Sequence, residues 1–178
     1  MGSPKALLRY GEETFLDTLT ALFAQRCTPV IVVLGAYAAQ IRAASTRPAT
    51  FVVNPDYALG MSTSLQCGLR AIPPDADGVL FTLVDHPAAT PATIDALLAP
   101  MDGHALLRVP RYRAKRGHPI LFSRDLIPEF LAVAPGAPAR DVVARHVDRT
   151  EYLDLDDPGI VADIDSPEDY RALVGAGI

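Results

Sequence analysis

The sequence contains no tryptophan and only two cysteines, Cys27 and Cys67, which lack the close spacing of a metal site. This scarcity excludes a disulfide-rich secreted domain, and we expect both thiols to be reduced in a cytoplasmic protein. No apolar run approaches the roughly 20 residues that a membrane-spanning helix needs. The chain shows no cationic segment followed by an apolar one, so we expect neither a secretory signal nor a membrane partner.

The chain is also short of positive charge. Its 16 basic and 21 acidic residues give a formal net charge of -5, which argues against a nucleic-acid partner bound through nonspecific electrostatics. A length of 178 residues with 49% hydrophobic content is enough to build one real core. No internal repeat, low-complexity segment or long linker divides the sequence, so we expect a single domain over residues 1–178.

Two kinds of apolar pattern alternate along the chain, one at helical spacing and one in short β-branched runs. Strands are predicted over residues 30–34, 51–53, 79–84, 104–109, 119–122, 152–155 and 160–164. Helices are predicted over residues 15–23, 36–44, 62–71, 93–98, 124–132, 139–147 and 167–174. This alternation predicts an α/β fold, a three-layer α/β/α sandwich around a Rossmann-like, mostly parallel sheet.

The strongest functional signal is the point where residues 79–84 end in Asp85, followed by His86 and Pro87. The near-continuous apolar run is typical of a strand buried on both faces, and Pro87 has no N–H with which to extend it. Ligands of open α/β sheets bind at the carboxyl ends of the strands, where a carboxylate suits Mg²⁺ carrying a phosphate. The alternative is that Asp85 only caps the following turn.

A second carboxylate follows another short apolar segment near the C-terminus. Ser166 is a good helix N-cap and Pro167 suits the first helical position, so Asp165 is predicted to lie in a strand-to-helix elbow. Two such carboxylates that converge would form a divalent metal site. Spacing along the chain does not prove convergence, and a simple turn residue at Asp165 is the alternative.

Five segments, taken in order, resemble the motifs of one family. They are Met1-Gly2-Ser3-Pro4-Lys5-Ala6-Leu7-Leu8, Gly60-Met61-Ser62-Thr63-Ser64-Leu65, Leu83-Val84-Asp85-His86-Pro87, Arg116-Gly117-His118-Pro119-Ile120-Leu121-Phe122 and Asp163-Ile164-Asp165-Ser166-Pro167-Glu168-Asp169. The set resembles MobA-like NTP transferases, the nucleotidyltransferases that attach CMP or GMP to molybdopterin. The sequences of the first and fourth segments are more similar to the cytidylyltransferase (MocA-like) branch than to the guanylyltransferase branch.

The resemblance implies a fold of the nucleotide-diphospho-sugar transferase type and Mg²⁺-dependent transfer of CMP from CTP to molybdopterin, with release of pyrophosphate. It implies catalytic roles for Lys5 and Asp85 and a metal site at Asp85 and Asp165. It implies nucleotide-binding roles for Gly2, Lys5, Ser62 and Ser64 and acceptor-binding roles for His118 and Arg116. A molybdoenzyme or its chaperone is implied as a further partner.

Each of these assignments has a structural alternative. Lys5 would otherwise be a solvated lysine, the hydroxyls of Ser62 and Ser64 would cap a helix, and His118 would be a turn residue. The basic loop over residues 111–116 either attracts an anionic pterin phosphate, with Tyr112 available to stack, or is a solvated loop. Alternative functions are transfer from GTP, a different phosphate acceptor, and a catalytically inactive binding protein.

One departure from the family pattern concerns the first strand. Family members begin with an apolar central strand and a loop of the type Leu-Ala-Ala-Gly-x-Ser-x-Arg directly before the Met-Gly segment, whereas this sequence starts at that methionine. Backbone N–H groups of such loops cradle phosphates. We therefore expect the first central strand to be missing, with either a gap in the sheet or two strands that close imperfectly over it. We also expect poor folding and no NTP turnover for the 178 residues as written.

Overall fold

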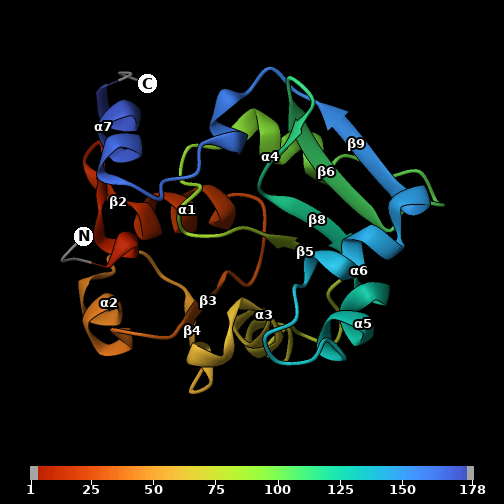
Figure 1. Cartoon of the computed structure of the whole chain (residues 1–178), viewed down its shortest axis with the longest axis horizontal. Coiled ribbons are helices and arrows are strands. Elements are labelled where there is room, and N and C mark those ends of the chain that lie inside the picture. Colours follow the sequence, from red (N-terminus) through yellow and green to blue (C-terminus); the bar gives the residue numbers. More distant parts are fainter. Residues whose placement is uncertain (1–3, 176–178) are drawn as a thin grey trace.

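The computed structural model describes residues 4–175, in which strands and helices alternate along most of the chain (Figure 1). A hairpin of β1 (Arg9–Tyr10) and β2 (Glu13–Thr14) leads into helix α1 (Phe15–Ala24). The Thr14 hydroxyl caps α1 by accepting a hydrogen bond from the third residue of the helix. After α1, β3 (Ile31–Leu34) pairs in parallel with β4 (Thr50–Val53), and α2 (Ala38–Ala44) connects the two.

Five further strands form a separate, mixed sheet. In spatial order these are β5 (Gly78–Phe81), β8 (Ile120–Ser123), β6 (Leu107–Tyr112) and β7 (Lys115–Arg116), with β9 (Thr150–Asp154) paired to β6. β8 runs antiparallel to both β5 and β6, whereas β9 runs parallel to β6. The sheet therefore contains one parallel pair, β6 and β9, and an antiparallel strand, β8, between β5 and β6.

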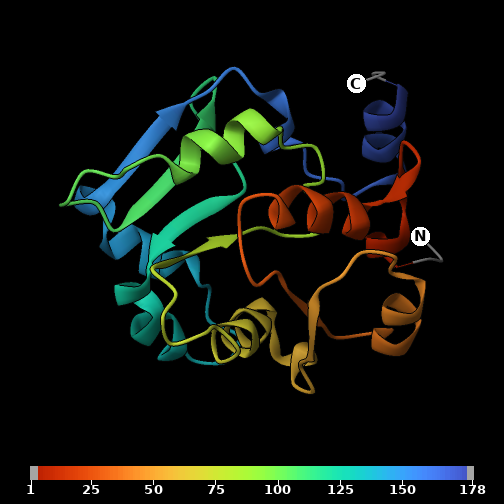
Figure 2. The same cartoon turned by 180° about the vertical axis from the view of Figure 1, so that it is seen from behind.

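Helices cover both faces of these strands (Figure 2). The remaining α-helices are α3 (Met61–Leu69), α4 (Pro91–Leu98), α5 (Ile127–Leu131), α6 (Arg140–Arg145) and α7 (Pro167–Gly175), and the 3₁₀ helices are η1 (Lys5–Leu7), η2 (Tyr57–Leu59), η3 (Arg124–Leu126), η4 (Val147–Arg149) and η5 (Pro158–Val161). α3, α5 and α6 share one apolar cluster with β6 and β8, in which Phe122 and Val142 are fully buried. α1 and α4 share a second cluster, around the buried Ile94, with β5. This arrangement confirms the predicted α/β sandwich.

The two sheets do not join. Within residues 4–175 no ladder connects β3 to β5, and a cavity of about 1400 Å³ lies between these strands, with α1 and α3 among its walls. β5 is consequently only half-buried along its length, although the sequence predicts a strand buried on both faces. The gap in the sheet that the sequence predicts is therefore present.

Three predicted strands are wrong in extent or type. The strand predicted over residues 104–109 is β6, which begins at Leu107 and continues to Tyr112. β5 ends at Phe81 and not at residue 84, because the backbone N–H of His118, which would extend the ladder to Leu83, donates instead to the carbonyl of Ile160. Residues 160–164 form no strand; η5 and an irregular segment replace it. The buried Asp157 carboxylate fixes this turn by accepting hydrogen bonds from the backbone N–H of Gly159 and the Thr93 hydroxyl.

No helix within residues 4–175 is long and apolar enough to cross a bilayer. The longest, α1, has ten residues and is amphipathic, with its apolar face turned inward. Asp17 of this helix is charged but buried, with an exposed fraction of 3%. It is buried because it connects α1 to the segment that leads into β4. The Asp17 carboxylate accepts hydrogen bonds from both the Ser45 and Thr46 hydroxyls and from the backbone N–H of Thr46.

We expect Asp17→Asn to lower the free energy of unfolding by about 2 kcal/mol near neutral pH, because a buried carboxylate loses charge-assisted hydrogen bonds. Burial by itself raises the pKa of Asp17, but the hydrogen bonds from Thr46 and Ser45 lower it overall. A lowered folded-state pKa stabilises the fold above the unfolded pKa, and this contribution is lost as the pH falls through the folded pKa. Urea unfolding across the acid range should thus show a flatter pH dependence for the variant. The exposed Asp148→Asn is the control, and equal stability of the two variants would contradict the assignment.

Candidate active site

Three charged side chains from distant parts of the sequence meet beside the hairpin. The Lys5 ammonium lies 2.6 Å from Asp165 Oδ1 and 3.4 Å from Asp85 Oδ2. Lys5 belongs to η1, Asp85 follows β5, and Asp165 precedes α7. The convergence of the two carboxylates, which sequence spacing leaves open, is thus observed.

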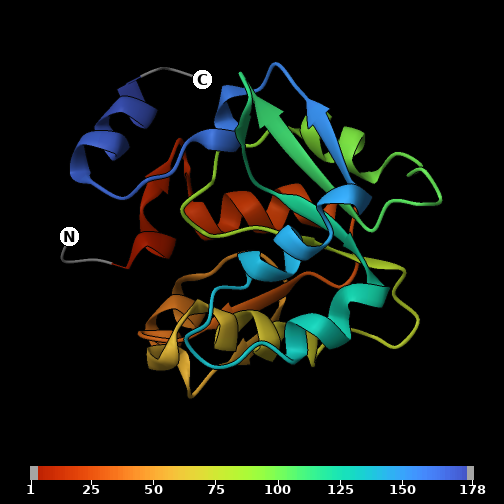
Figure 3. The same cartoon turned by 45° about the vertical axis from the view of Figure 1, so that its right-hand side comes forward.

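Backbone contacts hold the two acidic segments together. The N–H of Ile164 donates to the carbonyl of Asp85 at 3.1 Å, so the segment before α7 runs against the turn after β5. Ser166 and Asp169 bond each other reciprocally at the start of α7, which fixes the elbow that carries Asp165. Tyr170 Oη of α7 also donates to the Arg9 carbonyl, and Figure 3 shows α7 beside the N-terminal hairpin.

A group of possible metal ligands adjoins this ion pair. One ligand atom each from Asp85, His86 and Asp163 lie within 4.8 Å of one another. Asp85 Oδ1 and His86 Nδ1 are buried and have no hydrogen-bond partner within the described residues, so a cation would satisfy an acceptor that the fold leaves unused. Two carboxylates and an imidazole suit a divalent ion such as Mn²⁺ or Mg²⁺. The donor set therefore fits a metal.

Asp163 is the residue that the sequence analysis missed. Burial and the nearby charges of Asp85 and Asp165 raise its pKa, as expected for a carboxylate crowded by others. Asp163 and Asp165 are two residues apart, which is the spacing that places side chains on one side of an extended segment. That period-two repeat of aspartates is the signal by which Asp163 could have been found. Asp165, 72% exposed, instead pairs with Lys5.

His118 lies directly behind the ligand group. Its ring centroid is 4.7 Å from that of His86, and its backbone N–H donates to the carbonyl of Ile160 at 2.8 Å. Burial, and then the charge of His86, lower the pKa of His118 to about 4. His118 is therefore neutral near neutral pH, and its Nδ1 has no partner in the part of the chain that the structure describes. The predicted acceptor residue is thus in the same neighbourhood as Asp85.

Arg116, the other predicted acceptor-binding residue, makes a different set of contacts from His118. It lies on β7 with its guanidinium 5.2 Å from the ring centroid of Tyr152, and Arg111 lies 5.0 Å from the same ring. Tyr112, predicted to be available for stacking, packs against the cluster around Ile160 and has Arg113 over its ring. The basic hairpin therefore packs its arginines on its own Tyr112 and on Tyr152 of β9.

The predicted nucleotide-binding serines lie on α3. Ser64 Oγ accepts from Asn54 Nδ2 at 3.0 Å, so this hydroxyl has a structural contact of its own. Ser62 is 5% exposed, and its Oγ lacks a partner within residues 4–175. Gly60, and neither serine, occupies the N-cap position. Gly2, the remaining predicted nucleotide contact, lies outside the described residues.

Comparison with protein families matches residues 1–150 to the MobA-like NTP transferase domain. The chain belongs to the MobA-like NTP transferase family. This nucleotidyltransferase family has members with different substrates, and two curated relatives illustrate the range. Nicotine blue oxidoreductase of Paenarthrobacter nicotinovorans is 31% identical over 181 residues, covering 96% of this chain and 88% of the relative. Molybdenum cofactor cytidylyltransferase of Escherichia coli K12 is 26% identical over 172 residues, covering 96% and 86%.

Solved structures agree with the MobA-like fold. The manganese complex of Rv0371c from Mycobacterium tuberculosis H37Rv is 30% identical, with a TM-score of 0.78 over 98% of this chain and 93% of that chain. That protein was solved with a divalent metal. In this MobA-like chain the candidate ligands for a divalent metal are Asp85, His86 and Asp163.

Proposed function

We propose that this chain is a divalent-metal-dependent nucleotidyltransferase that transfers CMP from CTP to molybdopterin. The observation that carries the proposal is the position of Lys5, which lies between Asp85 and Asp165 at the edge of the Asp85–His86–Asp163 group. A cation beside a carboxylate cluster is the charge pattern that a metal–triphosphate complex requires. The family match makes nucleotidyl transfer the parsimonious use of that pattern.

In the proposed reaction a phosphate oxygen of the acceptor attacks the α-phosphorus of CTP. The bond between the α-phosphorus and the bridging oxygen breaks, and pyrophosphate leaves. Positioning and charge neutralisation carry such a reaction, because little covalent help is needed. Bound Mg²⁺ supplies Lewis-acid stabilisation of the phosphate oxygens.

The chain's own residues orient and neutralise the reactants. Asp85, His86 and Asp163 would hold the ion, and Lys5 would neutralise the triphosphate as a compact positive charge. Asp165 would also contribute to the metal site, as the family resemblance implies. The neutral His118 lies behind His86, where it shapes the acceptor side of the site.

The choice of CTP and molybdopterin has support of its own. The chain is similar to the cytidylyltransferase of Escherichia coli, which favours CTP and molybdopterin. The sequences of residues 3–8 and 117–122 resemble the cytidylyltransferase branch and favour the same substrates. Ser62 and Ser64 are the proposed nucleotide contacts, with Arg116 and His118 on the acceptor side. The 31% identical nicotine blue oxidoreductase shows that family membership alone does not choose the substrate.

We expect kcat/KM for CTP to exceed that for GTP at least about tenfold with molybdopterin and Mg²⁺, since this ratio requires only about 1.4 kcal/mol of difference in transition-state binding. The assay compares the 178-residue chain with the same chain preceded by an apolar strand and a glycine-rich loop of the family type. Pyrophosphate release measures transfer, and the absorbance of nicotine blue is followed in parallel as a test of its oxidation or reduction. A GTP preference would move the chain to the guanylyltransferases, and turnover of nicotine blue without transfer would overturn the proposed function.

A further inference from the structure

The 3₁₀ helix η5 lies beside the turn that leads into α4, and the candidate metal ligands are divided between these two segments. Asp85 and His86 are on the turn, whereas Asp163 follows η5 two residues after its end. Figure 2 shows η5, in the blue segment before α7, next to the start of α4. The separation of the ligands therefore depends on what holds η5 against the turn.

One buried carboxylate joins η5 to this turn. Asp157 Oδ2 accepts hydrogen bonds from the N–H and the hydroxyl of Thr90, at 3.0 and 2.9 Å, and from the Thr93 hydroxyl at 2.6 Å. Its other oxygen, Oδ1, accepts a hydrogen bond from the N–H of Gly159 at 2.9 Å. A single charged group thus binds donors of both segments, and its charge strengthens each of these hydrogen bonds.

The backbone is closely packed at the same junction. A Cβ atom at Gly159 would overlap the carbonyl oxygen of Ala88, and one at Gly117 would overlap the carbonyl oxygen of Ile160. The Ile160 carbonyl also accepts the hydrogen bond from the N–H of His118. η5 is therefore in direct contact with the turn on one side and with the segment of His118 on the other, so a shift of η5 would change the geometry of both contacts.

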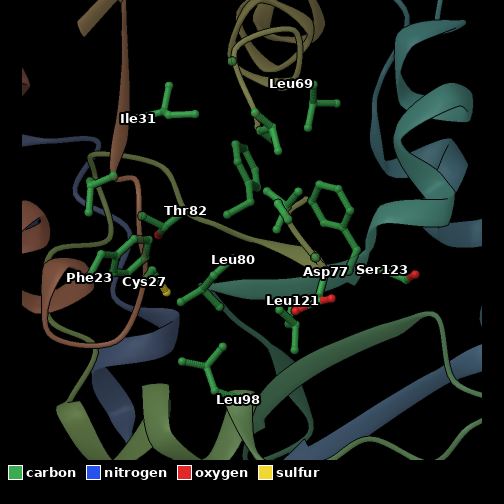
Figure 4. Close-up of a pocket in the computed structure, with 18 of the residues that line it drawn as sticks. Phe23, Cys27, Ile31, Leu69, Asp77, Leu80, Thr82, Leu98, Leu121 and Ser123 are labelled. Carbon is green, nitrogen blue, oxygen red and sulfur yellow. The ribbon is translucent and has the colours of Figure 1, made fainter. Parts of the chain in front are cut away.

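Core packing holds η5 on the protein independently of the carboxylate. Ile160 is fully buried in an apolar cluster with Phe23 and Leu80, which Figure 4 shows on the wall of the cavity between β3 and β5. This anchor remains when the charge of Asp157 is removed. We therefore expect a variant without this charge to fold, with η5 still on the protein but less precisely placed.

We propose that Asp157 is a positioning residue for the metal site. Its carboxylate holds η5 against the turn and thereby sets the separation between Asp163 and the neighbouring Asp85 and His86. The role rests on the divalent-metal site of the proposed function and adds to it a residue that lies outside the ligand group. Loss of a group that orients metal ligands typically weakens metal binding by about 10- to 100-fold.

Asp157→Asn keeps the size of the side chain but replaces one acceptor oxygen with an NH₂ group, so donors on η5 or on the turn lose their partner. We expect the Kd of the 178-residue chain for Mn²⁺, measured by electron paramagnetic resonance of the free ion, to rise about tenfold or more. Asp17→Asn is the matched control, because Asp17 is equally buried and hydrogen-bonded but joins α1 to residues 45–47. This control should lose stability and still bind Mn²⁺ as the wild type does.

Gly159→Ala tests the same contact without a change of charge. The added methyl group pushes η5 away from the Ala88 carbonyl, so Mn²⁺ binding should weaken as it does in Asp157→Asn. Amide hydrogen exchange of the metal-free proteins reports the displacement without any ion. The N–H groups of Ile164 and His118, which donate to the Asp85 and Ile160 carbonyls, should exchange faster in Asp157→Asn than in Asp17→Asn.

The outcomes separate this role from the metal site itself. Wild-type binding of Mn²⁺ with a Kd for Asp157→Asn within about threefold of that for Asp17→Asn would overturn the positioning role and leave the metal site in place. Equal exchange rates at Ile164 and His118 in the two variants would overturn the role as well. A wild-type chain that binds no Mn²⁺ would instead overturn the metal site of the proposed function, and the positioning role with it.

Discussion

Replacing Asp85 by asparagine is expected to weaken Mn²⁺ binding by about 100-fold or more, because the ion loses a charged oxygen ligand in a half-buried site. Asparagine keeps the shape of the side chain, so the turn after β5 should be preserved. Asp85 Oδ1 lacks a hydrogen-bond partner within residues 4–175, so the charge that asparagine removes is one that the fold leaves available to an ion. Titration of free Mn²⁺ by electron paramagnetic resonance gives the affinity.

Asp148→Asn removes the same charge from an exposed position and is the matched control for net charge. It should bind Mn²⁺ as the wild type does, and circular dichroism should show that both variants keep their secondary structure. In the amino-terminally extended chain, Asp85→Asn should also lower nucleotide transfer by orders of magnitude. Mn²⁺ affinity within about threefold of wild type would remove Asp85 from the proposed metal site.

Lys5→Met is expected to change two affinities in opposite directions. CTP binding should weaken by about 30-fold or more, since the triphosphate loses a charge-assisted partner. Mn²⁺ binding without nucleotide should become tighter, because the cation that competes for Asp85 and Asp165 is gone. Burial lowers the pKa of Lys5, but the hydrogen bond and charge of Asp165 and the charge of Asp85 raise it overall, so Lys5 is charged throughout the neutral range.

Lys115, the other lysine of the chain, supplies the control. It is exposed on β7, and Lys115→Met removes one positive charge without touching the carboxylates of the site. Calorimetric titration with CTP and with Mn²⁺ separates the two effects. A Lys5 variant that loses both affinities together, or neither, would contradict the proposed competition.

Much of the architecture follows from local patterns. The β-branched run before Gly35 forms β3 as predicted, and Pro91 begins α4 after the Thr90 cap. The gap between β3 and β5 follows from a comparison of motif order with the family, and the structure shows it as a cavity. Segments whose structure depends on distant partners are predicted less well. The apolar pattern of residues 160–164 is typical of a strand, but the buried Asp157 carboxylate fixes a 3₁₀ turn there.

In the candidate site, too, residues at the ends of elements were predicted, whereas contacts between distant segments were not. Lys5, Asp85 and Asp165 stand at recognisable junctions of elements, and they do converge. The participation of Asp163 depends on the bond from Ile164 to the Asp85 carbonyl, a contact between segments about 80 residues apart that no local pattern contains. His118 was identifiable, whereas its stacking on His86 required the packing of β8 beside β5.

The most direct measurement for the metal site is pulsed electron paramagnetic resonance of the Mn²⁺-loaded chain. Coordination by Asp85, His86 and Asp163 predicts a ¹⁴N coupling from one imidazole. The coupling should disappear in His86→Gln and persist in His118→Gln, because His118 lies behind His86 and outside the ligand group. Asp163→Asn should weaken binding more than Asp165→Asn in the absence of nucleotide. Bound Mn²⁺ without a nitrogen coupling, or a coupling that is lost in His118→Gln alone, would contradict the site.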